Sequence, residues 1–203
     1  MIKVDIKKET QGDFHEAEWV CEQAFYNLFD SGCSEHYLLH LLRDDSSYLP
    51  KLTRLAFIGD ELVGGIYYSE GKVVDNNGKE NDVITFGPLF VKPKYQKHGI
   101  GALLMRETFK LAKDEGYSGI IIFGHPDYYP HFGFKECSVF GIATETGDNF
   151  PPFMALPLNK EFENVHGRYF DAEVFKKATI EKGHEYDSNF PLLPKTSPKF
   201  TRG

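Results

Sequence analysis

The sequence lacks the features that mark several large classes of protein. No run of 18 or more apolar residues occurs among its 203 residues, so we expect no helix that spans a bilayer. Only three cysteines are present, Cys21, Cys33 and Cys137. They are odd in number, widely spaced and form no C-x-x-C pair, so we expect no cysteine-based metal site and take a reducing cytoplasm as the default location.

An excess of positive charge is also absent. The formal net charge is −7, which argues against nucleic acid as a main partner and is compatible with a cationic substrate such as an amine. With 41% hydrophobic residues the chain can bury a core in one domain with an appendage. We expect no membrane partner, and a monomer or a homodimer. The N-terminal Met1–Asp5 alternates as a strand does and does not resemble a secretion signal.

Hydrophobic periodicity and turn residues predict an α/β protein with a mixed sheet. We expect strands over residues 1–6, 52–58, 62–69, 82–91 and 119–124, and helices over 13–29, 34–42 and 102–115. Ser34 is a candidate N-cap, Gly59-Asp60 a hairpin turn, residues 75–78 a second turn, and Gly116 a helix stop. The expected buried face of the third helix consists of Leu103, Leu104, Leu111 and Ala112.

The strand at residues 82–91, the helix at 102–115 and the buried strand at 119–124 predict a right-handed βαβ unit with parallel strands. Gly87-Pro88 interrupts the first of these strands. A local splay there would admit a linear cofactor, and an ordinary edge-strand irregularity is the alternative. Proline-punctuated segments follow Phe150, so we expect a domain over residues 1–158 and a C-terminal extension over 159–203 with a loosely ordered end.

The most informative segment is Gln96-Lys97-His98-Gly99-Ile100-Gly101, at the turn from strand to helix. Glycines there let backbone N–H groups approach a bulky anion, and the helix dipole adds partial positive charge. The segment therefore predicts a phosphate or pyrophosphate site. Leu104 stands where the dinucleotide fingerprint needs a third glycine, and no Gly-Lys-Ser/Thr occurs. A diphosphate cofactor such as coenzyme A satisfies the pattern; a tight turn that only serves helix packing is the alternative.

A second segment, residues 125–134, follows the buried strand directly. Pro126 suits the first turn of a short helix and Gly133 suits its end. Together with Leu89-Phe90-Val91 and Gln96-x-x-Gly99-x-Gly101, Tyr129 four residues before Gly133-Phe134 makes the chain resemble the GNAT superfamily of N-acetyltransferases. It is most similar to a branch with a Tyr-Tyr pair before Phe-Gly-Phe. The resemblance covers most of residues 1–158 and is strongest from Phe86 to Phe134.

The resemblance implies a fold, a cofactor and a reaction. The fold is a central mixed β-sheet, splayed at the cofactor strand and flanked by helices. Acetyl-CoA would place its pyrophosphate on the glycine turn, and its pantetheine arm along the cofactor strand. An amine-bearing acceptor would then attack the thioester directly, and Tyr129 would return a proton to the leaving sulfur. The implied cofactor-binding residues are Leu89, Phe90, Val91, Gln96, Lys97, His98, Gly99, Ile100, Gly101 and Ala102.

Two departures from the family accompany the resemblance. An asparagine that many relatives carry near the start of the short helix is missing, and Asp127 is a possible substitute. No general base can be named, because the only carboxylate along residues 82–91 is Asp82, at the start of the strand, and Thr85 and Thr108 cannot serve. A catalytically weak acyl-CoA sensor is therefore an alternative to the transferase. Tyr128 is interpreted as core or pocket wall.

The histidines offer weaker indications. His125, Asp127 and His131 match no zinc spacing, so we expect no metal site and disfavour a metal-dependent hydrolase. His36 and His40 share one helix face at i and i+4. They are candidates for contact with the acceptor, and a solvated face is the alternative.

Overall fold

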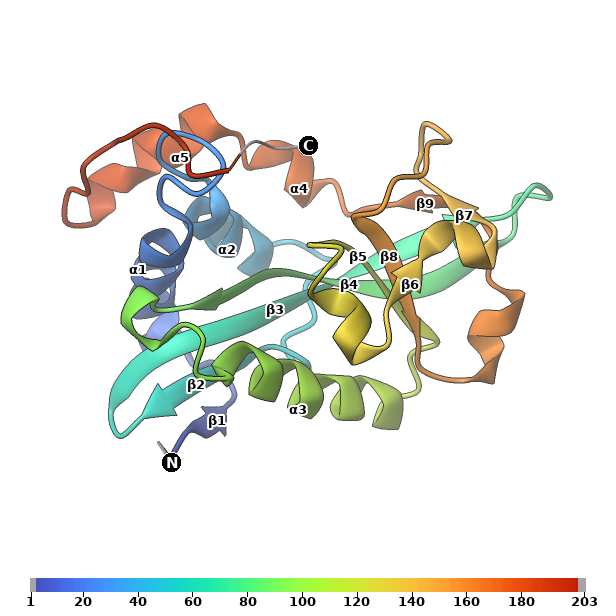
Figure 1. Cartoon of the computed structure of the whole chain (residues 1–203), viewed down its shortest axis with the longest axis horizontal. Helices are drawn as coiled ribbons and strands as arrows, with labels where there is room; N and C mark the ends of the chain where they lie inside the picture. Colours follow the sequence, from blue (N-terminus) through green and yellow to red (C-terminus); the bar gives the residue numbers. More distant parts are fainter. Residues whose placement is uncertain (1–2, 201–203) are drawn as a thin grey trace. The chain divides into compact units, whose positions relative to one another are not determined.

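The computed structural model describes residues 3–200 and divides the chain into two compact units (Figure 1). Of the described residues, unit 1 comprises 3–67, 88–108 and 173–200, and unit 2 comprises 68–87 and 109–172. β3 (Glu61–Val74), β4 (Glu80–Val91) and α3 (Ile100–Asp114) run from one unit into the other, and β4 does so between Gly87 and Pro88. Within the described range, no helix has both the length and the apolarity that crossing a membrane requires.

The strands of unit 1 form an antiparallel meander. β1 (Asp5–Lys7) pairs with β2 (Arg54–Ile58), which pairs with the first part of β3. Residues 1–2 of the predicted first strand lie outside the described residues. Ile58 pairs with Glu61, so the predicted two-residue hairpin is confirmed, and Gly59 supplies the φ of +60° at this turn.

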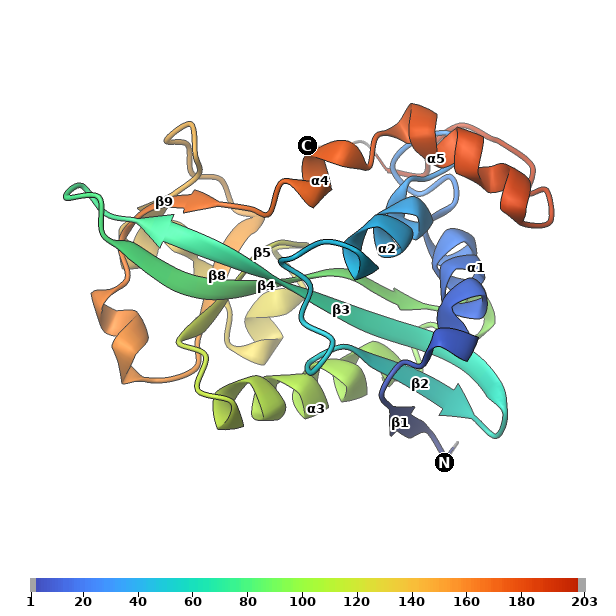
Figure 2. The ribbon, with the colours of Figure 1, turned by 180° about the vertical axis from the view of Figure 1, so that it is seen from behind.

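Helices flank these strands on both sides (Figures 1 and 2). After the short η1 (Gln11–Asp13), α1 (Phe14–Phe25) and α2 (Glu35–Arg43) lie on one side, and the first part of α3 lies on the other. α1 stops four residues before the predicted end, because Tyr26 is extended and Asn27 takes a φ of +57°. Ser34 occupies the N-cap position of α2 as predicted, although its side chain makes no capping hydrogen bond.

A buried ion network fastens α1 and α2 to the sheet. The Arg43 guanidinium of α2 pairs with Glu9 at 2.7 Å and with Glu18 of α1, and Tyr67 of β3 donates its hydroxyl to Glu9. These charges are almost fully buried, so their mutual pairing offsets the cost of removing them from water.

The C-terminal segment also belongs to unit 1. It contains α4 (Val174–Lys177), α5 (Ile180–Tyr186) and η6 (Asp187–Asn189), and α5 packs on α2. Asn27 holds the residues that follow: its side chain donates to Pro194 O at 2.8 Å and accepts from Thr196 N at 3.1 Å. The backbone N–H of Lys199 donates to Asn27 O at 3.0 Å. Backbone hydrogen bonds therefore continue to the end of the described chain, and the predicted loose order of 201–203 lies outside the described residues.

Unit 2 contains the mixed part of the sheet. Ile84 of β4 pairs with Ile120 of β5 (Gly119–Phe123) in parallel, as predicted, whereas β8 (Phe153–Pro157) pairs with β5 and with β6 (Lys135–Glu136) in antiparallel fashion. β9 (Gly167–Phe170) pairs with the second part of β3 and with β7 (Ile142–Ala143). Short helical turns η4 (Cys137–Phe140) and η5 (Lys160–Asn164) connect these strands. The core of unit 2 comprises Val73, Val83, Ile121, Cys137, Ile142, Phe153, Ala155, Phe162, Val165 and Tyr169.

α3 follows the predicted range, with one error in its buried face. Leu104 and Ala112 are fully buried, but Leu103 is 41% exposed. The helix begins at Ile100. Ile100, Met105 and Thr108 are also buried, and the helix face that these residues form with Leu104 and Ala112 does not include Leu103. Gly116 ends the helix with a φ of +89°, as predicted.

Replacing Gly183 by alanine should destabilise the protein, although alanine is normally the better helix former by about 0.5–1 kcal/mol. A Cβ at this position of α5 would lie inside van der Waals contact of the Cys33 carbonyl oxygen and 2.8 Å from Ser34 Cα. We expect Gly183→Ala to lower the free energy of unfolding by about 1–3 kcal/mol, measured by urea denaturation. Gly12→Ala is the control, because the nearest atom to its Cβ is Thr10 Oγ1 at 3.8 Å. Equal stability of the two variants would contradict this packing.

Candidate functional site

The glycine turn lies in unit 1 between η2 (Pro93–Tyr95) and α3. Two of its residues have left-handed backbone, Lys97 with φ +63° and Gly99 with φ +82°. No atom lies within 4 Å of the place where a Gly99 Cβ would stand, so space is open on that side. Gln96 donates its side-chain N–H to Val91 O at 3.0 Å, and His98 Nδ1 lies 2.8 Å from Gln96 O. Side chains of the turn thus fold back on its own backbone and leave the outer face open.

The backbone donors of this turn are unused by the protein. Within residues 3–200, the N–H groups of residues 97–102 have no protein acceptor, and the first bond of the helix runs from Leu103 N to Gly99 O at 3.0 Å. Residues 96–99 are exposed. Six consecutive donors at the positive end of a 15-residue helix make an anion site in which hydrogen bonding and the helix dipole act together. The turn can therefore hold a phosphate or a pyrophosphate.

A charged cluster fixes the segment that leads into the turn. Glu61, at the start of β3, contacts Lys92 Nζ at 2.7 Å and Lys94 Nζ at 2.8 Å, and accepts a hydrogen bond from Tyr95 at 2.7 Å. The hydrogen bonds from Lys92, then Lys94, lower the pKa of Glu61 to about 2. Sequence reasoning missed this residue, because nothing local to Glu61 marks it as the partner of a segment 31 residues later.

The end of β4 is packed against glycines of β3. Phe90 is buried and stacks on Tyr67 with ring centroids 6.1 Å apart. A Cβ on Gly65 would lie 2.7 Å from the Phe90 ring, and one on Gly64 would lie 2.7 Å from Phe90 O. Only glycine allows this close approach, which fixes the backbone of Leu89-Phe90-Val91 just before the glycine turn.

Tyr129 lies in unit 2, at the start of η3 (Tyr129–Phe132). The short helix begins three residues later than Pro126, where it was predicted, and ends as predicted at Gly133 with φ +94°. The Tyr129 ring packs against Phe86 at 5.9 Å and Phe134 at 5.6 Å. Its hydroxyl makes no hydrogen bond to a residue in the described range, so the phenol is held by its ring alone.

Burial, and secondarily Tyr128, raise the pKa of Tyr129 above its usual value. The phenol therefore stays protonated at neutral pH and can donate its proton. The Tyr128 ring packs edge-on against the Tyr129 ring, with the centroids 5.2 Å apart, and is 41% exposed. Of the two predicted roles of Tyr128, core or pocket wall, the core is therefore wrong, and pocket wall stays a prediction.

The remaining predicted polar residues are dispersed. His125, Asp127 and His131 are exposed, and His131 Nδ1 lies 3.2 Å from Tyr128 O. His40 is half exposed, but His36 is fully buried. His36 therefore lies neither on a solvated face nor where an acceptor could contact it. The C-terminal segment covers that side of α2.

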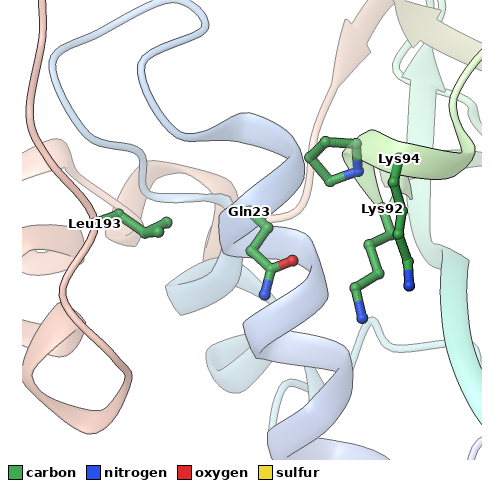
Figure 3. A pocket seen from close by; sticks show the side chains of 5 residues that line it. Gln23, Lys92, Lys94 and Leu193 are labelled. Atoms are coloured by element: carbon green, nitrogen blue, oxygen red, sulfur yellow. The ribbon is translucent and has the colours of Figure 1, made fainter.

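One pocket of about 350 Å³ lies within unit 1 beside the Glu61 cluster (Figure 3). Gln23 of α1 stands between Leu193 on one side and Lys92 and Lys94 on the other, and Pro93 completes the lining. Sequence reasoning missed Gln23 and Leu193, which carry no motif. The pocket is lined by the Gln23 amide and by Lys92 and Lys94, which precede the glycine turn by four and two residues.

The fold and the turn define a class before any comparison. A mixed α/β sheet whose parallel strand leads through a glycine turn into a helix with free N–H groups is the architecture of a phosphate-binding α/β protein. The model of the acetyltransferase (GNAT) family matches residues 13–134, and the chain belongs to this family.

Relatives extend this result. The uncharacterized N-acetyltransferase YjhQ of Escherichia coli (strain K12) is 30% identical over 103 residues, which are 50% of this chain and 55% of that protein. The chain thus matches only about half the length of this curated relative. The GNAT family N-acetyltransferase YhbS of Escherichia coli, solved in complex with CoA, has a TM-score of 0.74 at 22% identity and covers 87% of this chain and 93% of its own. A GNAT family acetyltransferase from Brucella melitensis, solved in complex with acetyl-CoA, has a TM-score of 0.69 at 25% identity, with 86% and 99% covered.

Gly124→Ala should displace the Tyr129 ring, because the added Cβ would lie inside van der Waals contact of ring carbons Cδ2 and Cε2. We expect the free energy of unfolding, measured in urea, to fall by about 1–3 kcal/mol. In a Tyr129→Ala background the same change should have almost no effect, which gives a coupling of about 1 kcal/mol or more in a double-mutant cycle. Strictly additive effects would show that the two residues do not touch.

Proposed function

We propose that this protein is an acetyl-CoA-dependent N-acetyltransferase whose acceptor is a primary amine of a small molecule or a protein. The observation that carries the proposal is the run of N–H groups at residues 97–102, which have no protein acceptor in the described range. Family membership and the CoA and acetyl-CoA complexes of similar structures support the choice of ligand.

The residues present fit such a ligand. The pyrophosphate would accept hydrogen bonds from the glycine turn, Gln96 to Ala102, where two residues with positive φ and an open Gly99 leave room for it. Lys97 adds an exposed ammonium to the same turn. The pantetheine arm would pair with the backbone of Leu89, Phe90 and Val91, whose position the β3 glycines fix.

The reaction needs one bond formed, one broken and two protons moved. The unprotonated amine nitrogen forms a bond to the acetyl carbonyl carbon, and the carbonyl oxygen becomes an oxyanion that a backbone N–H near Val91 stabilises. The carbonyl then re-forms as the carbon–sulfur bond breaks. The sulfur leaves as a thiolate and takes the Tyr129 hydroxyl proton, and the ammonium formed at nitrogen releases its proton to water. Tyr129 then regains a proton from solvent. The raised pKa of Tyr129 keeps the donor protonated for each turnover.

The proposal places the enzyme in the cytoplasm, where acetyl-CoA is available and where Cys21, Cys33 and Cys137 stay reduced; all three are free and buried. The acceptor is an amine-bearing molecule, consistent with the net charge of −7.

Gly99→Ala should weaken acetyl-CoA binding at least tenfold in titration calorimetry. Alanine adopts a φ of +82° only with a strain of about 1–2 kcal/mol, so the variant relaxes the turn and moves its N–H groups. Gly59→Ala is the matched control, because Gly59 has a φ of +60° and equally open surroundings in the β2–β3 hairpin. The control should lose stability but keep the parent's affinity. Equal affinity of both variants for acetyl-CoA would show that the glycine turn is not part of the binding site. If the parent protein binds no acetyl-CoA at millimolar concentration, the proposal is overturned.

Tyr129→Phe should lower kcat by about 10²–10⁴-fold and leave the Kd for acetyl-CoA unchanged, because only the proton donor is lost. Turnover is measured as free thiol released with a panel of primary amines. Tyr128→Phe, at the exposed neighbour, should keep the parent's kcat.

Because the pKa of Tyr129 is raised, its protonated form persists on the alkaline side, and the parent should lose no activity between about pH 7 and pH 9 through this group. Binding without turnover across the panel would identify an acyl-CoA sensor instead.

A further inference from the structure

Three buried polar side chains meet in unit 1. Glu22 comes from α1, His36 from α2 and Asp187 from the residue after α5, elements that lie side by side in both views (Figures 1 and 2). One ligand atom of each lies within 4.8 Å of the other two. The exposed fractions are 1% for Glu22, 0% for His36 and 8% for Asp187, so bulk water does not form hydrogen bonds with these side chains.

Each of these side chains has an atom without a partner. Glu22 Oε2, His36 Nε2 and Asp187 Oδ1 are buried, and none of the three forms a hydrogen bond of normal geometry with a residue in the range 3–200. His36 Nε2 and Asp187 Oδ1 are 3.2 Å apart, but this contact does not have the geometry of a hydrogen bond. Buried polar atoms almost always form hydrogen bonds. Three that form none and lie within 4.8 Å of one another therefore indicate a ligand between them.

The surroundings of His36 determine which ring nitrogen carries the proton. The Cys33 thiol donates to the Glu22 backbone carbonyl at 3.8 Å. Its sulfur also lies 3.4 Å from His36 Nδ1 and, with the thiol proton already engaged, can accept a hydrogen bond from that nitrogen. With the proton on Nδ1, Nε2 presents a lone pair to the carboxylates. Metal-binding histidines are oriented in this way by a partner on the other nitrogen.

The charges at this point are not balanced by the protein. Glu22 and Asp187 bring two carboxylates, and the one cation within ion-pair distance in the described range is Lys195, whose Nζ lies 3.7 Å from Asp187 Oδ2. His184, the other basic residue nearby, is bonded to Ser31 O at 2.7 Å. A divalent cation would supply the missing positive charge.

We propose that Glu22, His36 and Asp187 bind one divalent transition-metal ion of the Zn²⁺ type, which ties the C-terminal segment to α1 and α2. One imidazole nitrogen and two carboxylate oxygens are ligands that Zn²⁺ takes, whereas Mg²⁺ and Ca²⁺ prefer shells of six or more oxygens. Ligands bound to tetrahedral zinc at about 2.1 Å stand about 3.4 Å apart. The His36–Asp187 pair already has this spacing, and rotation of the Glu22 side chain completes the set. From the sequence alone we expect no metal site, and these ligands lie too far apart along the chain to form a spacing motif.

The test uses the full chain with affinity tags removed and bound metal stripped by a chelator. Calorimetry with ZnCl₂ should show one site per chain, and elemental analysis of the reloaded, desalted protein should find about one zinc. At a free Zn²⁺ concentration about 100 times Kd, Tm should rise by about 5 °C or more. MgCl₂ and CaCl₂ at the same concentrations should not raise it. A parent protein that takes up no zinc, or that binds Mg²⁺ or Ca²⁺ as tightly, overturns the proposal.

Glu22→Gln and Asp187→Asn keep side-chain size and remove one ligand charge each, so each should weaken Zn²⁺ binding at least tenfold and abolish the Tm shift. Glu16→Gln is the matched control, because Glu16 is exposed on the same helix. It should bind zinc as the parent does. Parent-like affinity in Glu22→Gln would place the ion elsewhere and overturn the site. None of these measurements depends on acetyl transfer.

Discussion

A run of six main-chain N–H groups without a protein acceptor, at residues 97–102, is the constraint to which the surrounding structure conforms. Such donors are tolerated only where water or an anion can reach them, so the turn is exposed while Ile100, one residue beyond its exposed part, is buried. The left-handed backbone of Lys97 and Gly99 and the ion pairs of Glu61 hold the turn in this form. In the proposed site, ligand affinity and local fold thus come from the same few residues, so a short motif can predict the class of cofactor.

The features that the sequence predicted well are those set by neighbours along the chain. Gly59-Asp60 and Gly116 act through backbone dihedrals that few other residues adopt, and the β-branched run of β5 cannot be satisfied at a surface. Leu103 shows the limit of the method. Consecutive residues of a helix point about 100° apart, so of the neighbours Leu103 and Leu104 only Leu104 lies on the inward face, and Leu103 is exposed.

The features that could not be predicted depend on partners distant in sequence. Glu61 is recognisable only beside Lys92 and Lys94, and His36 reads as a surface histidine until the C-terminal segment covers it. Tyr129 is intermediate: its spacing from Gly133 marks it as a candidate, but its packing against Phe86 and Phe134 joins residues that no periodicity connects. Buried charge is hard to foresee because its cost is set by the complete set of neighbours.

Asn27 and Glu22 have a consequence for how the chain is made. Both lie in the first part of the chain, yet the residues that they contact, Pro194, Thr196 and Asp187, follow them by more than 160 residues. Domains tend to fold as their residues emerge from the ribosome, but unit 1 combines residues up to position 108 with residues from position 173 onward and cannot close until the latter have been synthesised. During synthesis α1 and α2 therefore expose apolar and charged surfaces together, and this interval is when the nascent protein most needs protection from aggregation.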